Sequence, residues 1–249
     1  REVKRRINED LIPDEPWADR NMQSNPKNIM SCAKEILILI RSYKPFLQCF
    51  PHSVPIYSRH YQEYPIGFKQ AVAFTDWMKR LGVNAQLATN LPLKSISIKA
   101  GLGIYRRNSL VYIRESGSFI ILYAILIDQK LDRGIFFNNS SKEYLKECGD
   151  CNICINLCPT GAIKQNGVID LNKCIRNYMG SGRIIPDNIK IAYGTKLLGC
   201  EICQRVCPKN SKVLKESTLL TERELNAFSL VKLLDINESS WRETRKNIS

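Results

Sequence analysis

The sequence predicts an α/β protein with an α+β layout, in which a mixed domain is followed by a small cysteine-rich domain. Three observations favour this fold class. Apolar runs of strand length lie in the first half, a helical repeat of apolar residues lies between two of them, and eight of the ten cysteines lie between positions 148 and 207. The chain has 249 residues, of which 44% are hydrophobic, so it is long enough to bury a substantial core.

The first part of the chain predicts an arm and then a strand. Residues 1–30 are polar and contain three prolines, which indicates an irregular arm rather than core. The apolar run at 36–40 is continuous, as expected for a strand covered on both faces of a mixed or parallel sheet. Cys32 and Cys49 flank this run, and we interpret them as ordinary structural thiols, because free cysteine is commonly buried.

Apolar periodicity and turn residues divide the rest of the first half into further elements. Apolar side chains that recur every three to four residues indicate an amphipathic helix, and strict alternation indicates a strand. On these patterns the predicted elements are a helix over 68–81 ended by Gly82, a strand over 83–88, a short helix over 91–100, and strands over 110–113 and 119–127.

A polar, asparagine-rich stretch at 129–147 predicts a linker into the cysteine-rich domain. After the last cysteine the pattern is charged and mostly helical, and Leu230, Val231, Leu233 and Leu234 form a small apolar face that we expect to lie against the rest of the protein. The predicted parts are an arm over 1–30, an α/β domain over 31–140, a ferredoxin-like domain over 141–215 and a helical tail over 216–249.

The cysteines between 148 and 207 form two runs with ferredoxin spacing. In the first run, three thiols at intervals of three residues are followed by a fourth and by Pro159. In two-cluster ferredoxins the first three cysteines of such a run hold one cluster and the fourth reaches the other. The second run lacks its first cysteine, because Leu197 stands there, and Cys174 is the remaining thiol in this half. The predicted [4Fe–4S] ligands are Cys148, Cys151, Cys154 and Cys207 for one cluster, and Cys158, Cys174, Cys200 and Cys203 for the other.

Two other uses of these cysteines stay open. Paired Cys-x-x-Cys motifs also hold tetrahedral zinc, although the triple run and the two Cys-Pro endings favour iron–sulfur clusters. A disulfide framework of this density is typical of secreted chains below about 100 residues. The reduced thiols, and the lack of an apolar run approaching the roughly 20 residues of a spanning helix, predict a cytoplasmic protein without a membrane contact.

The formal net charge of +13 predicts an anionic partner. Two oxidised clusters would each add about two negative charges, and the excess would stay positive. Nucleic acid and an acidic electron-carrier protein both fit this charge, and a solvated lysine-rich surface explains it as well.

Tyrosines and histidines gather between positions 51 and 64. Both histidines of the chain and three tyrosines lie there, namely His52, Tyr57, His60, Tyr61 and Tyr64. They are candidate proton donors, and a loop that packs its aromatic rings explains them equally well.

With these motifs the chain resembles the epoxyqueuosine reductase family, the cobalamin- and iron–sulfur-dependent enzymes of queuosine synthesis in tRNA, and more distantly the reductive dehalogenases. The resemblance covers most of residues 31–245. It depends on the eight cysteines, the Ala-Gly-Leu-Gly segment at 100–103, the residues that follow it, and the tail at 230–243. It implies a nitroreductase-like cobalamin domain joined to a two-cluster ferredoxin domain. The implied cobalamin-binding residues are Ala100, Gly101, Leu102, Gly103, Arg107 and Asn108.

Two glycines spaced by one residue permit close approach of the backbone to a ligand, although a plain tight turn would also use them. We expect cobalamin between residues 100–108, the strands of 110–127 and the segment 52–64. The chain departs from the family at Arg106 and Tyr123, where small residues are usual, so these side chains are expected to enter the corrin's space. It also has Arg59-His60-Tyr61 where the family has Arg-Asp-Tyr, which makes His60 and Tyr61 the candidate proton donors.

The resemblance implies a reductase in which the clusters carry electrons from reduced ferredoxin or flavodoxin to cobalamin. An electron-transfer protein that reduces a corrinoid or a partner enzyme, without substrate chemistry of its own, is the alternative, and it accounts for the missing aspartate. A third hypothesis is a tRNA-binding protein derived from the reductase, which the positive charge supports.

Overall fold

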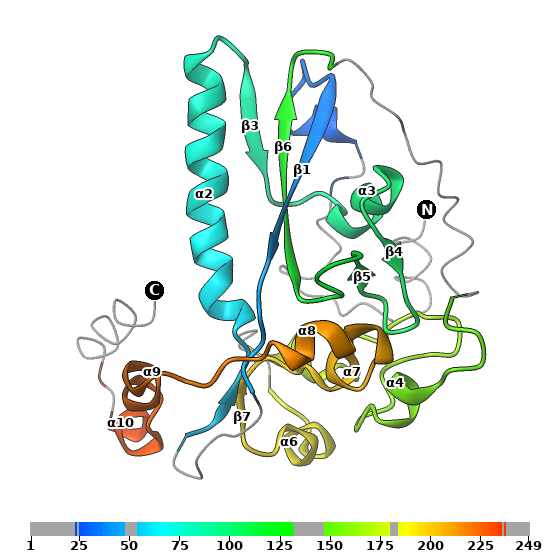
Figure 1. Ribbon diagram of the computed structural model, residues 1–249, viewed down its shortest axis with the longest axis vertical. Helices are drawn as coiled ribbons and strands as arrows, with labels where there is room; N and C mark the ends of the chain where they lie inside the picture. Colours follow the sequence, from blue (N-terminus) through cyan, green and yellow to red (C-terminus); the bar gives the residue numbers. More distant parts are fainter. Residues whose placement is uncertain are drawn as a thin grey trace.

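A three-stranded antiparallel sheet forms the centre of the first half of the chain (Figure 1). The computed structural model describes residues 23, 25–47, 54–131, 147–179, 184–235 and 237. Strand β6 (Ile120–Ile127) lies between β1 (Glu35–Ser42) and β3 (Ala85–Ala88), and its register with β1 runs from Glu35 opposite Ile127 to Ser42 opposite Ile120. No helix of these residues is long and apolar enough to cross a membrane.

The prediction for β1 was wrong in two respects. Its neighbour β6 runs antiparallel to it, and β1 lies at an edge of this sheet, where most of its residues are only half-buried. The central strand is β6, whose Ile125 and Leu126 are fully buried. A continuous apolar run therefore indicated a strand correctly here, but it did not distinguish an edge strand from a central one.

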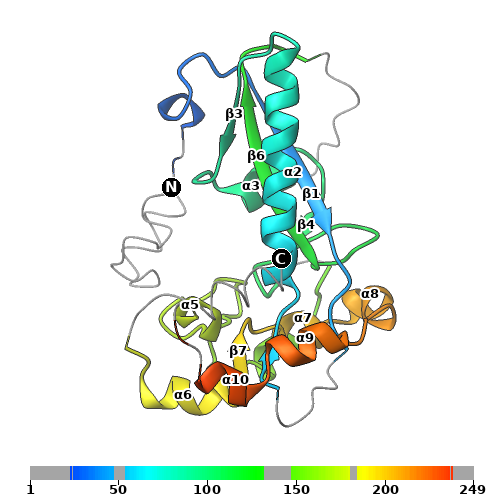
Figure 2. The same ribbon diagram turned by 90° about the vertical axis from the view of Figure 1, so that its left-hand side faces the viewer.

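Helix α2 (His60–Arg80) covers one face of the sheet (Figure 2). Met78 packs with Ala85, Ile125 and Ile127, which fixes the end of the helix on β3 and β6. The helix begins eight residues earlier than the predicted start at 68. Its first turn brings Glu63 against Arg59, four residues earlier, and against Arg41 on β1, and this ion-pair network supports the early start.

Tyr123 of β6 packs on the first half of α2. Its hydroxyl donates a hydrogen bond of 2.6 Å to the carbonyl of Tyr64, next to Pro65, which has no backbone N–H of its own. A Cβ added at Gly67 would lie 2.5 Å from that hydroxyl oxygen. Gly67 therefore provides the space that this tyrosine occupies.

The short helix predicted over 91–100 and the strand predicted over 110–113 are confirmed, and the latter pairs with a two-residue strand at 104–105 that was not predicted. Helix α3 (Leu93–Lys99) starts directly after Pro92 and packs beside the sheet, and β4 (Ile104–Tyr105) pairs with β5 (Val111–Tyr112) in a small hairpin. A 3-10 turn, η2 (Pro26–Asn28), precedes β1. Cys32 is exposed, which corrects its assignment as a buried thiol, and Cys49 lies outside the described residues.

Short helices joined by loops make up the described part of the cysteine-rich half. They are α4 (Ile153–Asn156), α5 (Ile175–Tyr178), α6 (Asp187–Tyr193), α7 (Ile202–Arg205), the 3-10 turn η3 (Pro208–Asn210) and α8 (Ser211–Lys215), with strand β7 (Lys196–Leu198) before α7. Most of the predicted linker lies outside the described residues.

The tail forms two short helices, α9 (Glu222–Ala227) and α10 (Leu230–Leu234). A capping box between Thr221 and Glu224 fixes the start of α9. The apolar side chains of α10 are not laid against the protein as predicted, because Leu230, Val231 and Leu234 are 40%, 67% and 84% exposed. It is Phe228, between the two helices, that is buried, in a cluster with Phe46, Val54 and Tyr57.

The two halves of the chain interlock through backbone and side chains. Strand β2 (Ile56–Tyr57) pairs in parallel with β7, and Ser118 exchanges hydrogen bonds of 2.9 Å with the fully buried Asn210. A Cβ added at Gly199, directly after β7, would lie 2.4 Å from Cβ of Ser58. These contacts hold the start of α2 against the cysteine-rich half.

Candidate functional site

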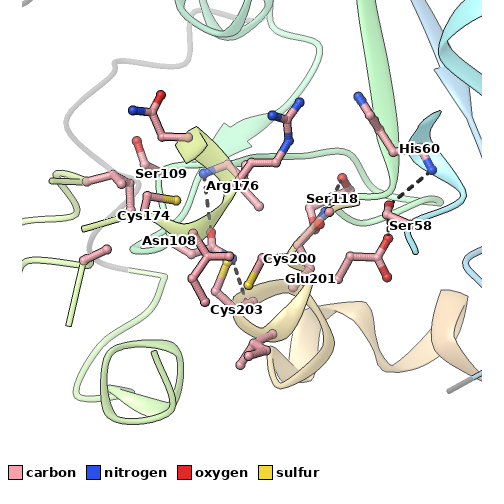
Figure 3. A pocket seen from close by; sticks show the side chains of 18 of the residues that line it. Ser58, His60, Asn108, Ser109, Ser118, Cys174, Arg176, Cys200, Glu201 and Cys203 are labelled. Atoms are coloured by element: carbon pink, nitrogen blue, oxygen red, sulfur yellow. Dashed lines mark hydrogen bonds between the residues drawn. The ribbon is translucent and has the colours of Figure 1, made fainter. Parts of the chain in front are cut away.

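A cavity of about 580 Å³ lies between the start of α2, the start of β6 and the cysteine-rich half. This is within the range of ligand pockets in proteins. Its walls are mainly apolar, with a few polar groups, several of which Figure 3 labels. The polar or reactive side chains that line it are Tyr43, Ser58, His60, Tyr61, Tyr64, Lys94, Asn108, Ser109, Ser118, Cys158, Thr160, Cys174, Arg176, Asn177, Cys200, Glu201, Cys203 and Gln204.

The four cysteines that we call the first thiol group, Cys148, Cys151, Cys154 and Cys207, lie close to one another and away from the cavity lining. Burial, together with the charges of Cys207, Cys148 and Cys151, raises the pKa of Cys154 to about 11. Cys151 is exposed, whereas the other three are half-buried.

The second thiol group, Cys158, Cys174, Cys200 and Cys203, lines the cavity. Burial raises the pKa of Cys200, and the charges of Cys174 and Cys158 act in the same direction. Burial likewise raises the pKa of Cys203, with Cys200 and Cys174 as the strongest charged neighbours. The backbone N–H of Ala162 donates a hydrogen bond of 3.3 Å to Sγ of Cys158.

These donor sets suit polynuclear iron clusters better than free thiols. Four thiolates in a partly desolvated place repel one another, and a cationic iron–sulfide core offsets that repulsion. In the described part of the chain no three His, Cys, Asp or Glu side chains converge closely enough to hold a single metal ion. The thiols within each group are nevertheless close enough to influence one another's charge.

His60 is the first residue of α2 and faces the cavity among aromatic rings. Its ring lies 6.1 Å from that of Tyr43 and 5.5 Å from that of Tyr61, both edge-on. Burial, together with the positive charge of Arg176, lowers the pKa of His60 to about 4. The imidazole is therefore neutral at pH 7.

Tyr61 also faces the cavity, and its hydroxyl is buried without a hydrogen-bond partner among the described residues. The guanidinium of Arg176 lies over its ring, 5.0 Å from the centroid. Burial raises the pKa of Tyr61, and Arg176 opposes this shift. His52, the other predicted histidine, lies outside the described residues.

A buried pair, Ser58 and Glu201, closes one side of the cavity, and the sequence analysis did not find it. The Ser58 hydroxyl donates to Glu201, and the Arg205 guanidinium donates to the other carboxylate oxygen, at 2.9 Å from Nε. The backbone N–H of His60 donates to the Ser58 hydroxyl at 3.2 Å, as Figure 3 shows. This network positions the start of α2 over the second thiol group.

The predicted glycine loop does not reach the cavity. None of the four residues at 100–103 lines it, and a Cβ at Gly103 would lie 2.5 Å from the carbonyl oxygen of Tyr112. The close approach that this glycine permits is therefore within the β4–β5 hairpin, which is the plain-turn alternative.

Arg107 and Asn108 contact the cysteine loops. Arg107 donates hydrogen bonds to the carbonyls of Cys151 and Gly149, at 2.8 and 2.9 Å, in the first thiol group. Asn108 lines the cavity and donates to the carbonyl of Cys203 at 2.9 Å, in the second group (Figure 3). Two adjacent residues thus each hold one thiol group.

Neither Arg106 nor Tyr123 lines the cavity. Arg106 is buried over the Tyr112 ring and pairs with Glu147 at 2.5 Å. Tyr123 lies on Gly67, as described above. These two side chains therefore do not narrow this cavity, and their expected intrusion into the space of a corrin stays a prediction.

Comparison with known proteins supports the cluster site. Residues 147–210 match the family model of a 4Fe-4S double cluster binding domain. The epoxyqueuosine reductase of Cyclobacterium marinum is 39% identical over 154 residues, which cover 60% of this chain and 44% of that protein. The epoxyqueuosine reductase of Bacillus anthracis is 27% identical over 240 residues, covering 90% of this chain and 61% of that protein.

The chain is similar in sequence to epoxyqueuosine reductases. It spans less than two thirds of the length of these curated relatives. The solved epoxyqueuosine reductase of Bacillus subtilis, with a catalytic loop swung out of its active site, has a TM-score of 0.77 and 21% identity, and the match covers 98% of this chain and 67% of that one.

A second solved epoxyqueuosine reductase is bound to an epoxyqueuosine-modified tRNA stem loop. It also has a TM-score of 0.77 and 21% identity, with 97% of this chain and 66% of that one covered. At this identity the two solved structures establish the shared fold, a mixed α/β part with a double-cluster domain.

Proposed function

We propose that the chain is an iron–sulfur reductase of the epoxyqueuosine reductase type, which carries two [4Fe–4S] clusters and acts with cobalamin. The observation that carries this proposal is the cavity, which is lined both by all four thiols of the second group and by His60 and Tyr61. Redox centre, ligand space and proton-bearing groups therefore meet in one place.

In this proposal Cys148, Cys151, Cys154 and Cys207 hold the first cluster, and Cys158, Cys174, Cys200 and Cys203 hold the second. Electrons enter at the first group, whose Cys151 is exposed, and leave from the second group into the cavity. Reduced ferredoxin or flavodoxin is the proposed donor, since a net charge of +13 favours acidic carriers. A reducing cytoplasm is the proposed compartment, because the clusters need reduced thiols.

The cavity is also the proposed cobalamin site, within a nitroreductase-like domain that spans residues 31–140 next to a cluster domain at 141–215. Its apolar walls, and the absence of Arg106 and Tyr123 from them, are compatible with a flat, largely apolar ring. Cobalamin, when bound, would supply the metal centre that accepts electrons from the second cluster and reduces the substrate. Asn108 is the member of the predicted binding set that reaches this place.

Tyr61 and His60 are the proposed sources of the proton. The Tyr61 hydroxyl has no partner in the described structure, so it is available to a ligand. His60 is neutral at pH 7, because burial lowers its pKa to about 4, so it can donate only from a neutral ring. Tyr61 is accordingly the stronger candidate, with Arg176 stabilising the tyrosinate that remains.

One observation favours the alternative of an electron-transfer protein without substrate chemistry. Of the described residues that line the cavity, only Glu201 has a carboxylate, and Ser58 and Arg205 already occupy both of its oxygens. No carboxylic acid in this cavity is therefore free to act as the proton donor. In that case the cavity would hold the corrinoid or the group that accepts the electrons.

Cobalamin titration under reducing conditions tests the proposal. We expect changes in the corrin absorption bands and thermal stabilisation at excess ligand. The absence of both changes would favour the electron-transfer alternative. If cobalamin binds, Tyr61→Phe or His60→Ala should lower turnover on an epoxyqueuosine-containing tRNA stem loop by a factor on the order of 100 while both clusters remain. Unchanged turnover in both variants would remove them from the proton path.

A further inference from the structure

Two buried hydrogen-bond donors at the cavity have no acceptor in the described structure, namely the hydroxyl of Tyr61 and the side-chain amide nitrogen of Asn177. The guanidinium of Arg176, which lines the same cavity and is exposed, lies over the Tyr61 ring. Buried donors without partners are rare in native proteins, and each one calls for an explanation. Arg176 and Asn177 lie two and three residues after Cys174, on helix α5, so a ligand that pairs with them would lie beside the second thiol group.

An aromatic ring orients the guanidinium of Arg176, but no acidic side chain of the described residues neutralises its charge. Its guanidinium stacks over the Tyr61 ring at 5.0 Å, and no carboxylate of the described residues pairs with it. Arg176 lines the cavity, and Figure 3 shows its side chain directed away from Cys200 and Cys203, toward the side on which His60 lies. The same charge contributes to the lowered pKa of His60, which places the guanidinium within electrostatic reach of that ring.

No free carboxylate of the described lining is available to these donors. Glu201 is its only acidic side chain, and Ser58 and Arg205 already hold both of its carboxylate oxygens. Stacking on a ring leaves the edge of a guanidinium open, and that planar edge matches the two oxygens of a carboxylate or phosphate. Lys94, which also lines the cavity, adds positive charge of the same sign.

We propose that Arg176 and Asn177, beside the Tyr61 hydroxyl, form an oxyanion subsite that binds a carboxylate or phosphate group of the substrate. This inference deepens the proposed function, on which it rests for the placing of a substrate in this cavity. The oxyanion would be held beside the second thiol group and next to the proposed proton donor. Arg176 is then a specificity-determining residue that selects anionic substrates.

Binding of inorganic phosphate to the anaerobic, cluster-loaded full chain tests this directly. Isothermal calorimetry at constant ionic strength, with chloride as the reference anion, should detect binding to the unmodified chain. Arg176→Ala should weaken it about 10-fold or more, since hydrogen bonds to charged groups contribute about 1.5–3 kcal/mol. Asn177→Ala should weaken it less. Lys190→Ala, which removes one positive charge from the exposed helix α6, should leave it unchanged.

Competition distinguishes the two sources of the oxyanion. Displacement of phosphate by acetate, dependent on Arg176, would indicate a carboxylate substrate, and displacement by a short RNA stem loop would indicate a nucleic-acid phosphate. Iron content of each variant is measured first, so that loss of a cluster, which concerns the proposed function, is not taken for loss of the subsite. Arg176→Lys, which keeps the charge, replaces Arg176→Ala if the latter loses iron, and should also bind phosphate more weakly.

Equal phosphate binding by the unmodified chain and the cluster-loaded Arg176 variant would overturn the proposal. A change only in the reduction potential of the second cluster would do the same, because Arg176 would then merely offset the negative charge of that cluster.

Discussion

The two thiol groups differ in what surrounds them. The first group has an exposed member, Cys151, and Arg107 fastens its loop to the turn between β4 and β5. The second group forms a wall of the cavity, and its loops are fastened by Asn108, by Ser58 through Glu201, and by the β2–β7 pair. The first group therefore faces outward and the second faces the ligand space.

This difference explains why both halves of the chain are needed. The first group is placed within the cysteine-rich half and by one neighbouring arginine. The second group becomes a functional site only where α2 and β6 complete its cavity. Changes at the second group should therefore affect ligand binding, whereas changes at the first should affect only the supply of electrons.

Removal of one cluster is the largest effect expected. Cys174→Ser should lower the iron content from about eight to about four per chain and leave the first cluster intact, because Cys174 belongs to the second group. Cys151→Ser is the matched change in the first group. Iron and acid-labile sulfide analysis with electron paramagnetic resonance of the reduced protein measures both. Zinc in place of iron and sulfide would contradict the cluster assignment altogether.

The backbone at Gly199, where the two halves of the chain interlock beside the second thiol group, should be the part least tolerant of an added side chain. Gly199 has φ +88°, and a Cβ there would lie 2.4 Å from Cβ of Ser58. Gly199→Ala should therefore lower the free energy of unfolding by about 3 kcal/mol, through a strained backbone and overlap together.

Gly82→Ala is the control for that substitution. Gly82 has φ +82°, but its added Cβ would meet nothing within 4 Å, so a cost of only about 1 kcal/mol is expected. Denaturant unfolding of both variants measures the difference. Equal losses would show that the contact with Ser58 is not important.

Acid should weaken the cavity side of the molecule through His60. Its pKa is about 4 in the folded protein against an ordinary 6.5, so the unfolded chain binds more protons between these values. The part of the free energy of unfolding that depends on the neutral His60 ring is fully present above pH 6.5 and is lost as the pH falls toward 4. We expect a loss on the order of 2 kcal/mol, discounted for partial exposure. His60→Gln should flatten this part of the profile, and an unchanged profile would contradict the buried neutral ring.

The smallest expected effects are those of Arg107 and Asn108, each of which holds the loop of one thiol group. Arg107→Ala removes hydrogen bonds to the Cys151 and Gly149 carbonyls and should speed iron release from the first cluster about 10-fold. Asn108→Ala should do so for the second cluster, because it removes the bond to Cys203. Chelator-induced bleaching resolved by electron paramagnetic resonance measures each rate. Faster release of the same cluster in both variants would refute the separate roles.

Much of this site could be predicted from the sequence, because cysteine spacing reflects local geometry. Three thiols at intervals of three are brought together by one short helical turn, so the first run could be recognised directly. Cys174 could be assigned to the group of Cys158 and Cys200 only because it was the remaining cysteine in this half of the chain. The prediction of β6 succeeded for a similar reason, since a fully apolar run of strand length is normally buried.

The contacts between distant segments could not be predicted. Strands β2 and β7 have two and three residues, too few for any period to show. The glycines at 101 and 103 suggested a ligand, but only the structure shows that Gly103 faces the carbonyl of Tyr112. Arg176 belongs to no motif, and its position over Tyr61 depends on helices α5 and α2 meeting.

In the proposed function, electrons leave through the second thiol group into the cavity. Stopped-flow mixing of the prereduced protein with hydroxocobalamin, followed in the corrin absorption bands, measures this transfer. We expect rapid reduction by the unmodified chain and at least about 10-fold slower reduction by Cys174→Ser, which retains the outward-facing first cluster. Reduction by Cys174→Ser at the unmodified rate would show that electrons do not leave through the second group.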